Sequence, residues 1–207
     1  RSRVGDREGT DEGDGVTDAA ARRVLISLMF PSMLMPLTSS MSRVALPVIR
    51  DHFAIRADET AWVATAFMLA FTVLMPVYGR LSDGLGPRRL LLIGVALFSA
   101  GTAVTALAPN LPWLVAGRAI QGMGAGGIMP LGMALISAIF APEKRGRALG
   151  VWSSVGPTTA FVGPVLAGVL IAAWGWRAAF ALPLAAGVVA FVVVRAAIPH
   201  GTNGRTP

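Results

Sequence analysis

The residues that could do chemistry in this sequence are few, and the most unusual is an arginine inside a long apolar run. Arg118 is followed one helical turn later by Gln121, so the two polar side chains would share one face of a helix. An arginine within a membrane span costs at least about 2.5–3.5 kcal/mol, so we expect Arg118 to face a cavity or a partner group. A guanidinium binds anions but does not readily release its proton. The alternative is that Arg118 snorkels to the nearer membrane surface.

A second group of polar residues forms the loop between the second and third apolar runs. Its members are Gly79, Asp83, Gly86, Arg88 and Arg89. The glycines allow a tight reversal of the chain and a close approach of two helices. Asp83 could cap a helix N-terminus and form an ion pair with Arg88. These residues predict a structured turn between two helices, and a generic basic turn is the alternative interpretation.

The remaining chemistry is limited by what the sequence lacks. There is no cysteine, which excludes disulfides and thiolate metal sites, and the two histidines, His52 and His200, lie outside the apolar runs. No pair of a nucleophile and a base, no metal cluster and no phosphate-binding loop is apparent. We therefore expect no enzyme activity, no metal and no cofactor.

A glycine-rich stretch after Arg118 has the spacing of a nucleotide-binding motif. Gly122-x-Gly124-x-x-Gly127 matches the dinucleotide fingerprint, but that fingerprint has meaning only between a strand and a helix. Here it lies inside one apolar run, where Gly122 and Gly126 have the GxxxG spacing of closely packed membrane helices. We expect helix packing here rather than nucleotide binding.

The elements that must position these residues are membrane-spanning helices. The chain is 54% apolar and only 14% charged, with a mean hydropathy of +0.64, whereas soluble domains carry about 25% charged residues. A helix is the conformation that lets each run cross a hydrocarbon core of about 30 Å with its backbone hydrogen-bonded. The sequence predicts an all-α, polytopic bundle of six transmembrane helices, with apolar runs at 24–48, 60–79, 90–108, 112–140, 148–173 and 178–194.

The basic residues predict the orientation of this bundle. Thirteen of the 18 lysines and arginines fall in the N-terminal tail and after the second, fourth and sixth runs, and three fall in the opposite loops. This alternation puts both termini in the cytoplasm, and it argues against nucleic-acid binding, which needs a continuous basic face. We expect a disordered acidic cytoplasmic tail at 1–21, the bundle at 22–195, and a polar tail or the start of an inter-domain linker at 196–207.

The polar loop and the arginine stretch both resemble signatures of the major facilitator superfamily. All five loop residues match the signature between its second and third helices, in which a glycine, an aspartate, a second glycine and two basic residues have fixed spacing. The resemblance implies that these residues form a cytoplasmic gate against the second half. Arg118, Gln121 and Gly122 match the motif of its fourth helix, whose arginine is tied to proton coupling. The resemblance implies the N-terminal half of such a transporter, built from two inverted three-helix repeats, with alternating access against a second half.

The fifth apolar run carries a third motif. Gly163, Pro164 and Gly168 resemble the Gly-Pro-x-x-Gly-Gly sequence of the drug/proton antiporter families, with Ala167 in place of one glycine. Small residues let this helix approach its neighbours, and the proline bends it. The resemblance implies export, and a plain packing face of small residues is the alternative.

Together these resemblances imply a multi-pass transporter of the plasma membrane that exports drugs or other amphiphilic small molecules in exchange for protons. Its expected partners are a small-molecule substrate, protons, the lipid bilayer and a second transporter half. No Asp or Glu lies deep in any run, and Thr38 stands where many drug exporters carry an acid, so we expect either a proton carrier in the second half or indirect coupling. The alternatives are a truncated or non-transporting six-helix membrane protein, or an uptake transporter for another small solute.

Overall fold

The computed structural model describes residues 11–198, with side chains from Ala19 onwards, and residues 1–10 and 199–207 lie outside this range. Over the described residues the chain forms helices and no strand. These helices are α1 Asp11–Phe53, α2 Ala57–Leu85, α3 Pro87–Ala106, α4 Leu111–Ala125, α5 Ile128–Ile139, α6 Pro142–Trp174 and α7 Ala178–Ala197. Because α4 and α5 together form one span, six helices are long and apolar enough to cross a membrane. The predicted all-α, six-helix fold is confirmed.

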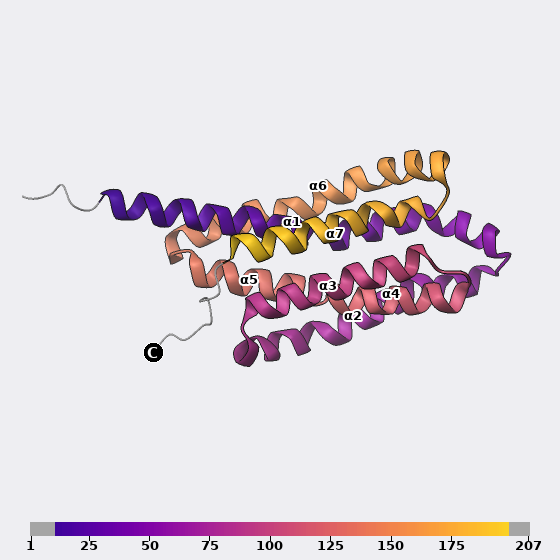
Figure 1. Cartoon of the computed structure of the whole chain (residues 1–207), viewed down its shortest axis with the longest axis horizontal. Coiled ribbons are helices and arrows are strands. Elements are labelled where there is room, and N and C mark those ends of the chain that lie inside the picture. The colour runs from indigo at the N-terminus through magenta and orange to yellow at the C-terminus, as the bar shows by residue number, and fades with distance from the viewer. Residues whose placement is uncertain (1–10, 199–207) are drawn as a thin grey trace, which may run out of the picture.

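The helices run side by side along the long axis of the molecule and form two groups (Figure 1). In one group α1 packs against α6 and α7, and in the other α4 packs against α2 and α3. The first helix of each predicted three-helix repeat therefore packs against the second and third helices of the other repeat. Contacts between α3 and α7, the last helices of the two repeats, join the groups. Packing of the first helix of each repeat against the other repeat is the arrangement expected of two inverted repeats.

Short local signals set the helix boundaries. Gly86 and Gly175 have φ angles of 80° and 79°, a region that favours glycine, and each ends one helix just before the next begins. The Asn110 side chain accepts a hydrogen bond of 3.2 Å from the Trp113 amide and so caps the start of α4. Because α4 begins at Leu111, Arg118 lies two helical turns after the start of this helix, inside the bundle.

The interior contains two apolar clusters, one toward each end of the bundle. Leu34, Phe67 and Phe98 belong to the cluster at the Gly86 end, and Met41 and Leu114 belong to the cluster at the opposite end. On α1, α3 and α4, buried polar side chains lie near the boundary between these clusters, namely Thr38, Thr102, Arg118 and Gln121. A polar layer therefore divides the hydrophobic core near its middle.

Two helices leave most of their apolar surface exposed. Only 22% of the most hydrophobic window of α2 and 17% of that of α6 is buried, against 56% for the span formed by α4 and α5. On α6, the Phe161 side chain is 83% exposed. Surfaces of this size in a membrane protein contact lipid or another part of the protein.

The first helix extends further than the sequence analysis predicts. We expected a disordered tail over residues 1–21, but α1 begins at Asp11 and is helical through the second half of that segment. The other half of the predicted tail lies outside the described residues. At the far end α7 stops at Ala197, close to the predicted end of the bundle at residue 195, and residues 199–207 are not described.

Candidate functional site

Arg118 lies in the polar layer, and its side chain is only 2% exposed. Its Nε donates a hydrogen bond of 3.1 Å to the Val63 carbonyl on α2. Its Nη1 donates to the Gln121 Oε1 and, at 3.4 Å, to the Thr38 Oγ1 on α1. The guanidinium thus faces the interior and contacts two other helices, so the snorkelling alternative does not describe this structure.

Gln121 connects the arginine to the third helix. Since a guanidinium can only donate hydrogen bonds, the amide oxygen of Gln121 faces Arg118 and the amide nitrogen faces two hydroxyls. This Nε2 donates to Thr38 Oγ1 at 2.9 Å and to Thr102 Oγ1 at 2.7 Å. The Thr102 hydroxyl in turn donates to the Phe98 carbonyl at 2.7 Å. Four helices therefore hold one buried hydrogen-bond network, which we call the Arg118 network: Thr38, Val63, Thr102, Arg118 and Gln121.

The positive charge of this network has no acidic partner in the part of the chain that the structure describes. The ion pairs Arg50–Asp51 and Arg56–Asp58 lie on the surface, away from this network. The face of the Phe67 ring lies 4.4 Å from the guanidinium carbon and adds a cation–π contact. Among the described residues Nη2 donates no hydrogen bond. Uncharged acceptors and an aromatic ring therefore hold a buried cation that keeps one donor unused.

Gly122, which the sequence analysis groups with Arg118 and Gln121, lies at a helix contact rather than in a cavity. A Cβ atom at this position would overlap the Phe67 carbonyl oxygen of α2, so only glycine permits the observed approach. Gly124 and Gly126 make comparable backbone contacts with α3 and α2. The glycine-rich stretch thus serves helix packing, in line with the packing interpretation of its spacing.

The predicted ion pair between Asp83 and Arg88 is not formed. Helix α2 continues through Leu85, which leaves Asp83 exposed in its last turns, and the cap position of α3 is taken by Gly86 without a side-chain hydrogen bond. Arg88 instead donates to main-chain carbonyls at the end of α7, from Nε to Ile198 at 2.6 Å and from Nη2 to Arg195 at 3.1 Å. These carbonyls have no partner within their helix and form the negative end of its dipole, which explains why they attract the guanidinium.

The other two residues of the loop motif contribute little to packing. Gly79 has no atom within 4 Å of where its Cβ would be, and Arg89 is exposed. The surface formed by Gly79, Asp83 and Arg89 is therefore not covered by other described residues.

The three motif residues of α6 are divided between two faces of the helix. Gly163 is buried against α1, where a Cβ atom would overlap the Ser40 hydroxyl, and Ala167 is buried one turn later. Pro164 and Gly168 lie on the exposed face, and Gly168 has open space around it. Ser40 is two residues from Thr38, so α1 connects the Arg118 network to this motif.

Sequence reasoning missed two side chains of the site, Phe67 and Thr102. Neither carries a signal of its own, since phenylalanine is ordinary in a membrane span and a threonine hydroxyl bonds its own helix. Thr38 was singled out only as a departure from the family's acidic position. It proves to be the residue where the Arg118 and Gln121 hydrogen bonds meet.

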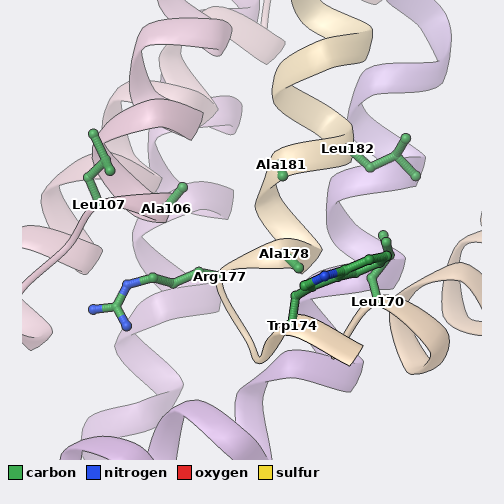
Figure 2. A pocket seen from close by; sticks show the side chains of 8 residues that line it. All are labelled: Ala106, Leu107, Leu170, Trp174, Arg177, Ala178, Ala181 and Leu182. Atoms are coloured by element: carbon green, nitrogen blue, oxygen red, sulfur yellow. The ribbon is translucent and has the colours of Figure 1, made fainter. Parts of the chain in front are cut away.

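A groove at the opposite end of the bundle from Gly86 is formed by α3, α6 and α7 (Figure 2). Its walls are almost entirely apolar, and the Arg177 and Trp174 side chains extend to opposite sides of it. The Arg177 Nη2 donates to the Ala108 carbonyl at 3.1 Å, and its guanidinium lies 4.5 Å from the Trp176 ring. Because the Arg177 guanidinium already has these partners, the groove offers a ligand fewer free polar groups than the Arg118 network does.

Comparisons with known proteins agree with this architecture. Residues 28–206 match the model of the Major Facilitator Superfamily. Over 163 residues the chain is 35% identical to multidrug resistance protein Stp of Mycobacterium tuberculosis, covering 78% of this chain and 30% of Stp. Over 167 residues it is 30% identical to riboflavin transporter RibZ of Clostridioides difficile, covering 81% of this chain and 37% of RibZ. It spans about a third of the length of these curated relatives.

The fold is also that of solved transporters. The structure of the proton:xylose symporter XylE, bound to a bromodeoxyglucose, superimposes with a TM-score of 0.79 at 15% sequence identity. The similarity covers 88% of this chain and 46% of the XylE chain. The six described spans thus correspond to about half of a complete transporter fold.

Proposed function

The chain belongs to the Major Facilitator Superfamily, and on that premise we propose that it forms one half of a proton-coupled exporter of drugs or other amphiphilic small molecules. The observation that carries the proposal is the Arg118 network, a buried guanidinium without a counter-ion. A buried charge is stable only when it is paired or well hydrogen-bonded. The unused donor of Arg118 therefore supports a carboxylate as its partner, from the substrate or from a second half.

Proton coupling follows if that carboxylate belongs to the second half. A carboxylate near a guanidinium is favoured in its charged form, and protonation removes the attraction between the two groups. Binding of a proton would thus weaken the contact between the halves near Arg118, and release of the proton would restore it. In this scheme Arg118 stays charged and shifts the populations of the access states, while the second half carries the proton.

The second half is the proposed partner of the exposed surfaces on α2 and α6. Both helices present wide apolar faces that the six spans do not cover. Asp83 and Arg89 are exposed at the end of α2 and the start of α3, where a gate residue would need to reach a neighbouring bundle. We place this loop on the cytoplasmic side of the plasma membrane, with both termini, because of the alternation of basic residues.

A test of the function compares Arg118→Lys and Arg118→Ala with wild type in the full-length transporter. Lysine keeps a positive charge but cannot form the planar set of contacts to Val63, Thr38 and Gln121. Since one hydrogen bond to a charged group is worth about 1.5–3 kcal/mol, we expect both variants to lose at least about tenfold of proton-driven ethidium flux in everted vesicles. Membrane insertion, followed by immunoblotting, should be unchanged.

The matched control is Arg43→Lys, because Arg43 lies in the apolar part of α1 but is exposed and bonds only the Ser39 carbonyl. The Arg43→Lys variant should retain proton-driven ethidium flux. Wild-type flux in Arg118→Lys would contradict the role of Arg118.

A second candidate function is the transport of one defined solute, because RibZ is named a riboflavin transporter. The same vesicles distinguish the two. Exchange of ethidium for protons supports drug export, whereas riboflavin flux without ethidium flux supports the solute transporter.

A further inference from the structure

A groove with a basic rim lies between α1 and the first turns of α6, at the Gly86 end of the bundle. It has a volume of about 720 Å³, within the range of about 300–1,000 Å³ typical of small-ligand sites. Its basic lining residues are Arg22 on α1 and Lys144 and Arg147 on α6. The groove is separate from the Arg118 network and from the three sequence motifs.

The two helices that form the groove carry matching stripes of residues. On α1, Arg22 is followed by Ile26 and Met29, which lie one and two turns further along the same face. On α6, Arg147 is followed one turn later by Val151. Both helices begin at this end of the bundle, so the later residues of each lie deeper in the membrane (Figure 1). The groove is therefore cationic at its entrance and apolar toward the bilayer centre.

Two of the cations at the entrance, Arg22 and Arg147, are available for an anion. Arg22 and Arg147 are exposed and take part in no ion pair within the described part of the chain. The one acidic residue of α6 is Glu143, and it does not line the groove. The apolar walls are also uncovered, since Ile26 is 53% and Val151 is 43% exposed. A ligand that fits both parts must have an anionic head and an apolar tail.

We propose that this groove binds an anionic phospholipid of the adjacent leaflet. Arg22 and Arg147 hold the headgroup phosphate from two helices, and an acyl chain lies along Ile26, Met29 and Val151. Basic pockets between membrane helices at the level of the headgroups have the chemistry that recognises such lipids. A free phosphate would use the cations but leave the apolar walls exposed, so the lipid matches more of the groove.

The test is native mass spectrometry of the full-length transporter in detergent, titrated with phosphatidylglycerol or phosphatidylcholine of the same acyl chains. Wild type should bind phosphatidylglycerol more tightly. Arg22→Gln combined with Arg147→Gln should reduce that preference by about 25-fold, because each basic residue near anionic lipid contributes roughly a fivefold factor. The control, Arg23→Gln combined with Arg195→Gln, removes the same charge from exposed residues at the same end that do not line the groove, and it should keep the preference.

Two further measurements separate the possible occupants. Val151→Trp fills the apolar part of the groove and should weaken both lipids without changing their ratio. Millimolar inorganic phosphate should not displace phosphatidylglycerol. The proposal is overturned if wild type shows no preference, if the control loses it equally, if Val151→Trp binds both lipids like wild type, or if inorganic phosphate competes. Absence of a preference in wild type is informative without any variant, so a failure of the double variant to fold does not affect the outcome.

Discussion

Gln121 is the residue on which the buried network depends, because its oxygen accepts from the arginine and its nitrogen donates to two threonines. We predict that Gln121→Leu lowers the free energy of unfolding by about 1–3 kcal/mol, since buried groups on three helices lose a partner. Thermal unfolding in detergent measures this effect. Thr105→Val is the control, because the Thr105 hydroxyl bonds only the Gly101 carbonyl of its own helix, and it should cost less than about 1.5 kcal/mol.

A second substitution at this position tests whether the missing counter-ion matters for function. Gln121→Glu would place a carboxylate beside Arg118 and neutralise its charge inside the half. We predict a folded protein with little transport, because neither a ligand nor a second half would find an unpaired cation. Flux assays in everted vesicles measure the result, and wild-type flux in Gln121→Glu would show that the unpaired charge has no role.

The two charged motifs show what sequence can and cannot predict about single residues. An arginine in an apolar run is visible from the sequence alone, and its burial follows from the cost of exposing it to lipid. Its partners Phe67 and Thr102 depend on how α2 and α3 pack around α4. The predicted ion pair between Asp83 and Arg88 is absent for a related reason. Helix α2 continues past Asp83, and Arg88 donates instead to the carbonyls of Arg195 and Ile198 at the end of α7.

At the scale of helices, the motif of α6 predicts a difference between two glycines only five residues apart. Gly163→Ala should lower the free energy of unfolding by about 1–3 kcal/mol, because its methyl group would overlap Ser40 on α1. Gly168→Ala should be neutral or stabilising by up to about 1 kcal/mol, because its surroundings are open and alanine favours a helix. Thermal unfolding measures both.

The same contact offers a rescue experiment. Ser40→Ala removes the hydroxyl that an added methyl group would meet, so it should recover part of the stability lost by Gly163→Ala. Equal effects at the two glycines, or no rescue by Ser40→Ala, would indicate that the α1–α6 contact does not limit packing at Gly163.

The helix positions themselves were well predicted, and the reason is physical. Every span must be long and apolar, so each leaves a continuous signal, and the run at 112–140 correctly marked one span although α4 ends at Ala125 and α5 begins at Ile128. The sequence does not show which face of each helix is buried. Both faces of a membrane helix are apolar, so the exposed surfaces of α2 and α6 emerged only from the structure.

At the scale of the whole molecule, the orientation in the membrane stays a prediction that labelling can test. The chain has no cysteine, so single cysteines can be introduced at exposed positions without removing native ones. Asp58→Cys and Asn110→Cys should react with an impermeant maleimide added to intact cells, whereas Arg89→Cys and Glu143→Cys should react only in permeabilised cells. Labelling of Arg89→Cys in intact cells would reverse the orientation proposed from the basic residues.

Thr38 and Ser40 lie on nearly opposite sides of α1, because residues two apart on a helix differ by about 200° around its axis. One side meets the Arg118 network, and the other meets Gly163 of α6. A rotation of α1 about its axis that breaks the Thr38 hydrogen bonds must therefore also change the packing of Ser40 against Gly163. The two contacts are thus energetically coupled. If a ligand bound at the Arg118 network changes the equilibrium of the Ser40–Gly163 contact by some factor, thermodynamic reciprocity requires that forming this contact changes the affinity for the ligand by the same factor.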